Sequence, residues 1–157
     1  MEEHMSVKTI LWPTDLSRYS RESIDEVVSL STLYNAKVVV LYSTIDLCSY
    51  FPAYGNYPDQ DRLNDFRDWE VEKARKSLNK LCEEELRSCP LIEIRLTLGD
   101  PVKNIIEHAK KENADLIVIS SHGLGSEKKN SAPDAIGSVT DQVIKQSPVS
   151  VHVIKNR

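Results

Sequence analysis

Long apolar runs are absent from this sequence: none approaches the roughly 20 consecutive residues that a membrane-spanning helix needs. The N-terminal segment, MEEHMSVK, is acidic and lacks an apolar core, so we expect no secretory signal peptide there. Cysteine is scarce as well, because Cys48, Cys82 and Cys89 form no CxxC pair and leave an odd count. A disulfide framework is therefore not expected, and we predict a cytoplasmic protein with reduced thiols.

A strong excess of basic charge is also missing. The sequence has 20 basic and 24 acidic side chains, a formal net charge of -4. A nucleic acid or an anionic membrane normally requires a basic face, so neither is expected as the main partner. The balance of 40% apolar and 28% charged residues is that of an ordinary globular protein. We expect one domain over residues 1–157, with residues 1–6 as a flexible N-terminus.

Strand and helix patterns alternate along the whole chain. Apolar, β-rich runs predict strands, and apolar residues at three- and four-residue steps predict amphipathic helices between them. Ser17 is the expected N-cap of the first helix. This βαβαβαβαβ order is typical of an α/β protein with a mostly parallel sheet and helices on both faces. The expected strands cover residues 8–13, 36–43, 91–98, 114–120 and 149–155, and the expected helices cover residues 18–34, 62–88, 102–112 and 138–146.

The strand patterns also predict where each strand lies in the sheet. The first, second and fourth strands are continuous apolar runs, as expected where both faces are covered. The third strand alternates apolar residues with Glu93 and Arg95, and the fifth alternates valines with Ser150 and His152, which suits edge strands. A five-stranded, Rossmann-like sheet in the order 3-2-1-4-5 meets these conditions. Its ligand would bind beyond the carboxyl ends of the first and fourth strands, at the switch point.

Two segments are candidates for ligand contacts near that point, and a third is irregular. Asp15 follows the first strand and is either a turn or capping aspartate or a carboxylate that accepts from a base or ribose hydroxyl. The turn from Gly99 to Pro101 opens a helix, so it has a structural reason to be there as well as a place at the site. The segment from Ile45 to Asp61 holds four aromatic residues and is either a surface loop packed on the body or a lid or partner-binding flap.

The loop SSHGLGSEKKNSAPDAIGS, Ser120 to Ser138, joins the fourth strand to the last helix. Gly123 and Gly125 would let the backbone approach a ligand. Gly137 and Ser138 begin the helix, where free N–H groups and the helix dipole favour a phosphate. The loop is therefore a candidate phosphate-binding segment.

The sequence gives only weak indications of further phosphate contacts, catalysis or metal binding. Lys128 and Lys129 would add charge to the loop, although solvation of a surface loop explains them more simply. His122 is a conceivable base, but no serine or cysteine nucleophile with an orienting acid is legible beside it. His108 and His152 lack metal-ligand spacing, and the sequence has no GxxxxGK[ST] loop and no strand-to-helix GxGxxG. We expect no catalytic residue and no metal site.

Four segments in order resemble the universal stress protein family over nearly the whole chain: KTILWPTDLS, VVVLYSTID, GDPVKNIIEHAKKENADLIVISSHG and GSVTDQVIKQSPVSVHVIK. The resemblance implies the five-stranded α/β fold in the order 3-2-1-4-5. It also implies a homodimer through the fifth strands, here Val149 to Ile154, because an alternating apolar edge invites a second strand.

Members of that family divide into proteins that bind ATP and proteins that do not, and the binders resemble G-x2-G-x9-G-[ST]. In this chain Gly123, preceded by His122, fits the second glycine of the pattern. Gly137 and Ser138, followed by Val139, fit its end. The resemblance therefore implies a phosphate site at both ends of the loop.

Two departures alter the phosphate half of this pattern. Ser120 replaces the first glycine and adds a hydroxymethyl group that would either crowd the ligand or hydrogen-bond to it. Thirteen residues separate Gly123 from Gly137, four more than the pattern has, although a longer surface loop costs little closure entropy. The phosphate half is altered at these two points.

The nucleoside half of the pattern is intact. Asp15 matches the family's nucleoside-contacting aspartate, with Pro13 and Thr14 beside it. Ser43 falls where the end of the second strand offers backbone to the adenine. The resemblance thus predicts an adenine-nucleotide-binding regulatory dimer of the stress response, with ATP, alone or with Mg²⁺, as its ligand and no strong catalysis. The alternatives are a nucleotide-free dimeric adaptor whose altered loop contacts partners, and a slow ATPase.

Overall fold

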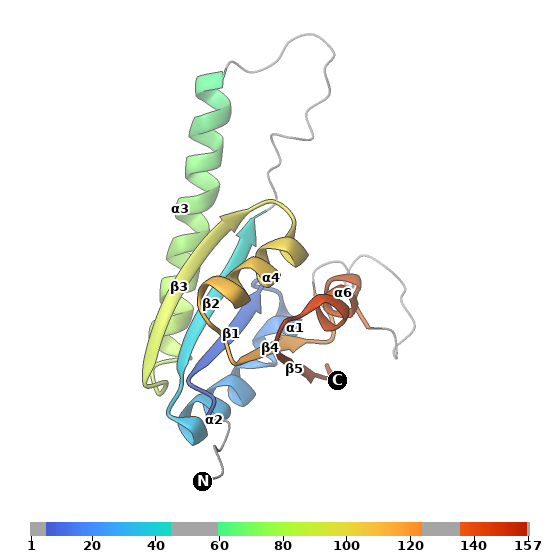
Figure 1. Cartoon of the computed structure of the whole chain (residues 1–157). Coiled ribbons are helices and arrows are strands. Elements are labelled where there is room, and N and C mark those ends of the chain that lie inside the picture. Colours follow the sequence, from blue (N-terminus) through green and yellow to red (C-terminus); the bar gives the residue numbers. More distant parts are fainter. Residues whose placement is uncertain (1–5, 45–59, 124–135, 157) are drawn as a thin grey trace.

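One parallel sheet organises the molecule. The computed structural model describes residues 6–44, 60–123 and 136–156, and its five strands lie in the order β3-β2-β1-β4-β5, all parallel (Figure 1). The predicted order is confirmed, with the two alternating strands at the edges. The strands are β1 (Thr9–Thr14), β2 (Lys37–Thr44), β3 (Leu91–Leu98), β4 (Leu116–Ser120) and β5 (Ser150–Ile154). The helices are α1 (Arg18–Arg21), α2 (Ile24–Tyr34), α3 (Gln60–Glu84), α4 (Pro101–Lys111) and α6 (Ser138–Gln146).

Helices cover both faces of the sheet. α2 and α3 pack on one face, around Trp12 and Leu78, and α4 and α6 pack on the other, around Leu11 and Val143 (Figure 1). All six residues of β1 are buried, as a central strand between two helical layers requires. The residues of the edge strand β3 are half-buried or exposed. The continuous and the alternating apolar patterns thus correspond to central and edge positions.

The helix expected over residues 18–34 is in fact two helices, and this part of the prediction was wrong. α1 ends at Arg21, and α2 begins at Ile24. The buried Ser23 lies between them, where its hydroxyl oxygen accepts from Trp12 Nε1 at 2.8 Å and its hydroxyl donates to Ser20 O. A serine that bonds back to the preceding turn bends a helix, so this bridge to β1 accounts for the break.

The long helix α3 begins earlier and ends earlier than expected, and only its C-terminal half lies on the sheet. Its buried residues begin at Ala74 and include Leu78 and Leu81, and its first turns extend beyond the sheet (Figure 1). Phe66, expected on the buried face, is 38% exposed, and Trp69 is 55% exposed. The apolar residues of α3 therefore continue into its N-terminal half, which does not pack on the sheet.

Cys82 on α3 and Cys89 after it are buried free thiols. Burial raises the pKa of Cys82 to about 11, and Cys89 and Glu83 add to the rise. Burial also raises the pKa of Cys89, although a hydrogen bond from Ser31 opposes the shift. Both thiols are protonated at neutral pH and are poor nucleophiles. Cys48 lies outside the described residues.

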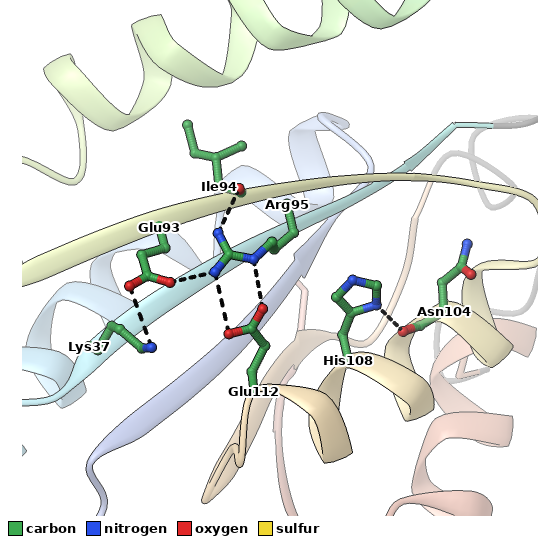
Figure 2. A network of polar contacts seen from close by, with 7 residues as sticks. All are labelled: Lys37, Glu93, Ile94, Arg95, Asn104, His108 and Glu112. Atoms are coloured by element: carbon green, nitrogen blue, oxygen red, sulfur yellow. Dashed lines mark hydrogen bonds and ion pairs between the residues drawn. The ribbon is translucent and has the colours of Figure 1, made fainter.

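A charged network covers the β3 edge beside α4 (Figure 2). Arg95 Nε donates to Glu112 Oε1 at 2.7 Å, and Arg95 Nη2 donates to Glu93 Oε2 at 2.6 Å. Lys37 Nζ lies 3.5 Å from Glu93 Oε1. The hydrogen bond to Glu112, the least exposed member, is the main cause that raises the pKa of Arg95. Charges on an edge strand oppose pairing with another strand, so this network disfavours the addition of a strand at β3.

Candidate functional site

The turn after β1 fixes the first group of predicted site residues. Pro13 and Thr14 are buried within β1, and Thr14 Oγ1 accepts from Leu16 N at 3.1 Å. Asp15 Oδ1 accepts from Ser17 N at 2.9 Å. Ser17 caps α1 as predicted, because its hydroxyl oxygen accepts from the backbone N–H of the third helical residue. The structure thus supports a turn role for Asp15, through the hydrogen bond from Ser17 N.

The other oxygen of Asp15 faces the loop after β4. A Cβ added at Gly123 would collide with Asp15 Oδ2, so only glycine fits there while Asp15 keeps its place. The two segments are 108 residues apart in the sequence and meet because β1 and β4 are neighbours in the sheet. The predicted juxtaposition of the PTDLS turn and the glycine loop is thus confirmed at Asp15 and Gly123.

The start of α6 is held against the same loop. Gly137 N donates to Ser121 O at 2.7 Å, and a Cβ added at Gly137 would lie 3.2 Å from that carbonyl oxygen. Thr140 Oγ1 donates to Ser120 O at 2.8 Å. Ser138 is exposed and Val139 is half-buried at the first turn of the helix. The two ends of the loop are therefore adjacent, whatever the length of chain between them.

The hydroxyl of Ser120 turns into the protein. Ser120 is 5% exposed, and its hydroxyl donates to His122 O at 2.7 Å. The single hydroxyl hydrogen is therefore already used within the loop, and the two expected roles, crowding a ligand or hydrogen-bonding to it, stay predictions. The serine that replaces a glycine is accommodated by the fold itself.

His122 makes structural contacts. Its Nδ1 lies 3.0 Å from Ser121 Oγ, and its ring centroid lies 5.9 Å from that of Tyr19. Ser121 is 5% exposed, and its hydroxyl oxygen also accepts from Asn156 N at 3.0 Å. Ser121 and His122 thus belong to a hydrogen-bonded network that ties the loop after β4 to the residues after β5, and the expectation that His122 is not a catalytic base stays a prediction. Asn156 was not anticipated from the sequence, because it lies beyond every recognised motif.

Ser43 lies at the end of β2 within a second polar group. Its Oγ is 3.0 Å from Thr97 Oγ1 on β3, and Asn104 Nδ2 on α4 is 3.4 Å from it. Asn104 Nδ2 also donates to Leu98 O at 3.0 Å. The Ser43 side chain is thus engaged inside the protein, and only its backbone remains to play the predicted role. Thr97 and Asn104 were missed because they are far from Ser43 in the sequence.

Tyr42, one residue before Ser43, has a raised pKa. Burial raises the pKa of the Tyr42 hydroxyl, and the carboxylates of Glu70 and Asp15 raise it further. The phenol is therefore neutral at physiological pH and can donate a hydrogen bond. His108, by contrast, bonds within its own helix, with Nδ1 2.9 Å from Asn104 O (Figure 2).

The turn from Gly99 to Pro101 is explained by helix capping. Gly99 has a φ of +104°, which favours glycine, and Asp100 Oδ1 accepts from Val102 N at 3.0 Å. Pro101 occupies the first helical position, where its missing N–H has no cost. Of the two readings left open for this turn, the structural one is supported.

Several predicted features lie outside the described residues, namely Gly125, Lys128, Lys129 and most of the aromatic segment, residues 45–59. In the ranges that the structure does describe, no group of three or more His, Cys, Asp or Glu side chains is placed to hold a metal ion. Nor does any described helix have the length and apolar character to cross a membrane.

The sheet order and its switch point define a doubly wound α/β protein. The model of the universal stress protein family matches residues 6–155, and this chain belongs to that family. Universal stress protein MJ0531 from Methanocaldococcus jannaschii is 29% identical over 150 residues, which cover 94% of this chain and 82% of that protein. The predicted family is thereby confirmed.

Solved structures of the family share the fold. UspA from Lactobacillus plantarum superposes with a TM-score of 0.77 at 25% identity, covering 96% of this chain and 99% of that one. A universal stress protein in complex with cAMP has a TM-score of 0.64 at 23% identity, covering 95% of this chain and 97% of that one.

Proposed function

We propose that this chain is an adenine-nucleotide-binding regulatory protein of the stress response, and that the N-terminus of α6 holds the nucleotide's phosphates. One observation carries the proposal: Gly137 begins α6 beside the loop in which Gly123 meets Asp15. Gly137 has no side chain of its own to cap the helix, and no side-chain cap hydrogen bond is formed there within the described residues. In this proposal an external anion accepts from the N–H groups of the first turn of α6, where no described side chain caps the helix.

Helix electrostatics support a phosphate at this place. The first N–H groups of a helix have no intrahelical acceptor, and the terminus carries about half a positive charge. The N–H groups of Ser138 and Val139 would donate to phosphate oxygens, and the exposed Ser138 hydroxyl would add a further donor. ATP is the ligand we propose, and Mg²⁺, where present, would be ligated by the phosphate oxygens.

The nucleoside would lie between β1 and β2 in this proposal. The Asp15 carboxylate, placed between the turn after β1 and Gly123, would accept from a ribose hydroxyl. The backbone at Ser43 would contact the adenine edge. A family member with bound cAMP, itself an adenine nucleotide, supports adenine as the base.

The regulatory part of the proposal is a cytoplasmic, non-catalytic homodimer. β5 is an edge strand whose residues Val151, Val153 and Ile154 are only half-buried in the single chain. An alternating apolar edge is suited to pairing with a second copy, so we place the dimer contact at residues 149–154. Nucleotide binding would then alter what protein partners meet at the surface of the dimer.

Chromatography of the material released when the purified protein is denatured tests the function. We expect an adenine nucleotide, and we expect the stripped protein to bind ATP more tightly than GTP. An Asp15→Ala variant should lose affinity for ATP and for adenosine alike, with Asp25→Ala on the exposed side of α2 as the matched control. Stripped protein that binds neither ATP nor GTP would reject the proposal and favour a nucleotide-free adaptor.

A further inference from the structure

Asn156 is a buried polar residue just beyond β5 that the proposed function does not yet use. The residue is 9% exposed, and its side chain makes four hydrogen bonds. Asn156 Oδ1 accepts from His122 N at 3.0 Å and from Ser121 Oγ at 3.2 Å. Asn156 Nδ2 donates to Tyr19 O and to Glu22 Oε2, each at 2.9 Å. The full capacity of one amide group, two donors and two acceptor positions, is used.

These bonds join three separate segments of the chain. Tyr19 and Glu22 belong to α1 and the turn after it, Ser121 and His122 follow β4, and Asn156 follows β5. The backbone adds to the junction, because Ser121 N donates to Ile154 O at 2.8 Å. A carboxylate could not donate to Tyr19 O, and an apolar side chain could make none of these bonds, so an amide suits the position.

The residues that Asn156 holds are those that shape the candidate site. Ser121 O accepts from Gly137 N and so locates the start of α6. Gly123, the residue after His122, lies against Asp15. We propose that Asn156 is the positioning residue of the nucleotide site, which it fixes by holding the loop after β4 between Asp15 and α6. This inference rests on the proposed function but also predicts a property of the ligand-free protein.

The test uses Asn156→Asp, a substitution of nearly equal shape. It keeps an acceptor for His122 N but replaces both donors, and it sets a carboxylate beside that of Glu22. We expect exchange of the His122 backbone amide hydrogen to quicken about tenfold or more and ATP affinity to fall about tenfold, a difference of about 1.4 kcal/mol. Amides of β1, followed in the same exchange experiment, report whether the core is still folded.

Two further variants separate positioning from a general loss of stability. Asn113→Asp makes the same chemical change at an exposed residue after α4 and should leave both readouts at wild-type values. The double variant Asn156→Asp with Glu22→Gln removes the charge repulsion and lets the introduced amide donate to the carboxylate, so both readouts should recover in part. Should Asn156→Asp not fold, Glu22→Ala removes a single acceptor and should quicken His122 exchange more modestly.

The outcomes are distinguishable from those of the proposed function. Faster His122 exchange with weaker ATP binding, both improved by Glu22→Gln, supports the positioning role. Unchanged His122 exchange in Asn156→Asp, or faster exchange with wild-type ATP affinity, overturns it. If the wild-type protein does not bind ATP, the nucleotide proposal and with it the positioning role at a nucleotide site are rejected, while the exchange result still shows whether Asn156 holds the loop.

Discussion

α4 and α6 lie on the same face of the sheet, each after a parallel strand, yet their N-termini are built differently. α4 carries its own anion, because Asp100 Oδ1 accepts from Val102 N and Pro101 has no N–H to satisfy. α6 begins at Gly137, which offers no side chain. The N-terminus of α4 is capped from within the chain, whereas that of α6 has no side-chain cap among the described residues.

Position at the carboxyl edge of a sheet therefore does not by itself predict a phosphate site, because the capping of the following helix matters as well. A capping carboxylate satisfies the terminal N–H groups and repels a second anion, whereas a glycine leaves them available. α6 does carry Asp141 in its first turn, but that carboxylate is paired with Lys145 Nζ at 2.8 Å. The motif GDP therefore supplies its own helix cap, and GS marks the helix start at which we propose the phosphate site.

An aspartate cap on α6, like that of Asp100 on α4, should have the largest effect on ATP affinity. In Gly137→Asp the new carboxylate would cap α6 and repel phosphates, so we expect ATP affinity to fall at least about 30-fold, or about 2 kcal/mol. Gly137→Asn has the same shape without the charge and should lose less. Titration calorimetry on both variants measures the difference, and wild-type affinity in Gly137→Asp would place the phosphates elsewhere.

A methyl group at Gly123 should have the next largest effect, and it should act through Asp15. Because the added Cβ collides with Asp15 Oδ2, Gly123→Ala should displace the carboxylate and weaken ATP binding about tenfold. In an Asp15→Ala background the same change should cost little further, since the atom it strikes is gone. Additive losses in this double-mutant cycle would show that the two residues act separately.

Removing the cap of α4 should change stability but not binding. Asp100→Ala should lower the free energy of unfolding by about 1 kcal/mol and the melting temperature by about 2–4 °C, through the loss of the cap bond. ATP affinity should stay within experimental error of the wild type. A strong loss of ATP affinity in Asp100→Ala would move the anion site from α6 to α4.

Restoring glycine at residue 120 should have the smallest effect. The Ser120 hydroxyl donates to His122 O and points into the protein, so Ser120→Gly should change ATP affinity less than about threefold, or about 0.7 kcal/mol. Titration calorimetry with ATP measures the difference between Ser120→Gly and the wild type. A tenfold gain in affinity would mean that the hydroxymethyl group crowds the ligand after all.

The sheet order was predictable because the apolar pattern of each strand depends on how many of its faces are covered. Continuous apolar runs occur where both faces are covered, and alternation marks the edges, as Arg95 on β3 shows. The break between α1 and α2 was missed because it depends on a hydrogen bond from Trp12 to Ser23, a contact that no helical period encodes. The free start of α3 was missed because a pattern does not show how far the sheet extends.

The site was predictable where family motifs reach and unpredictable where the fold alone brings residues together. Asp15 and Gly123 were named in advance and lie against each other in the structure, and Gly137, also named in advance, lies against Ser121 of the same loop. The direction of the Ser120 hydroxyl was open, since one residue type allows either outcome. Asn156 was missed because its partners lie 34 to 137 residues away along the chain.

The most direct measurement of the central claim is a thermal melt of nucleotide-free protein with ATP, adenosine or GTP. A ligand at 100 times its dissociation constant adds about 2.7 kcal/mol, which moves the melting temperature by roughly 5–10 °C in a chain of this size. We predict a rise of that order with saturating ATP, a clearly smaller one with the same concentration of adenosine, and little change with GTP. Equal rises with ATP and adenosine, or no rise with ATP, would contradict the phosphate site at α6.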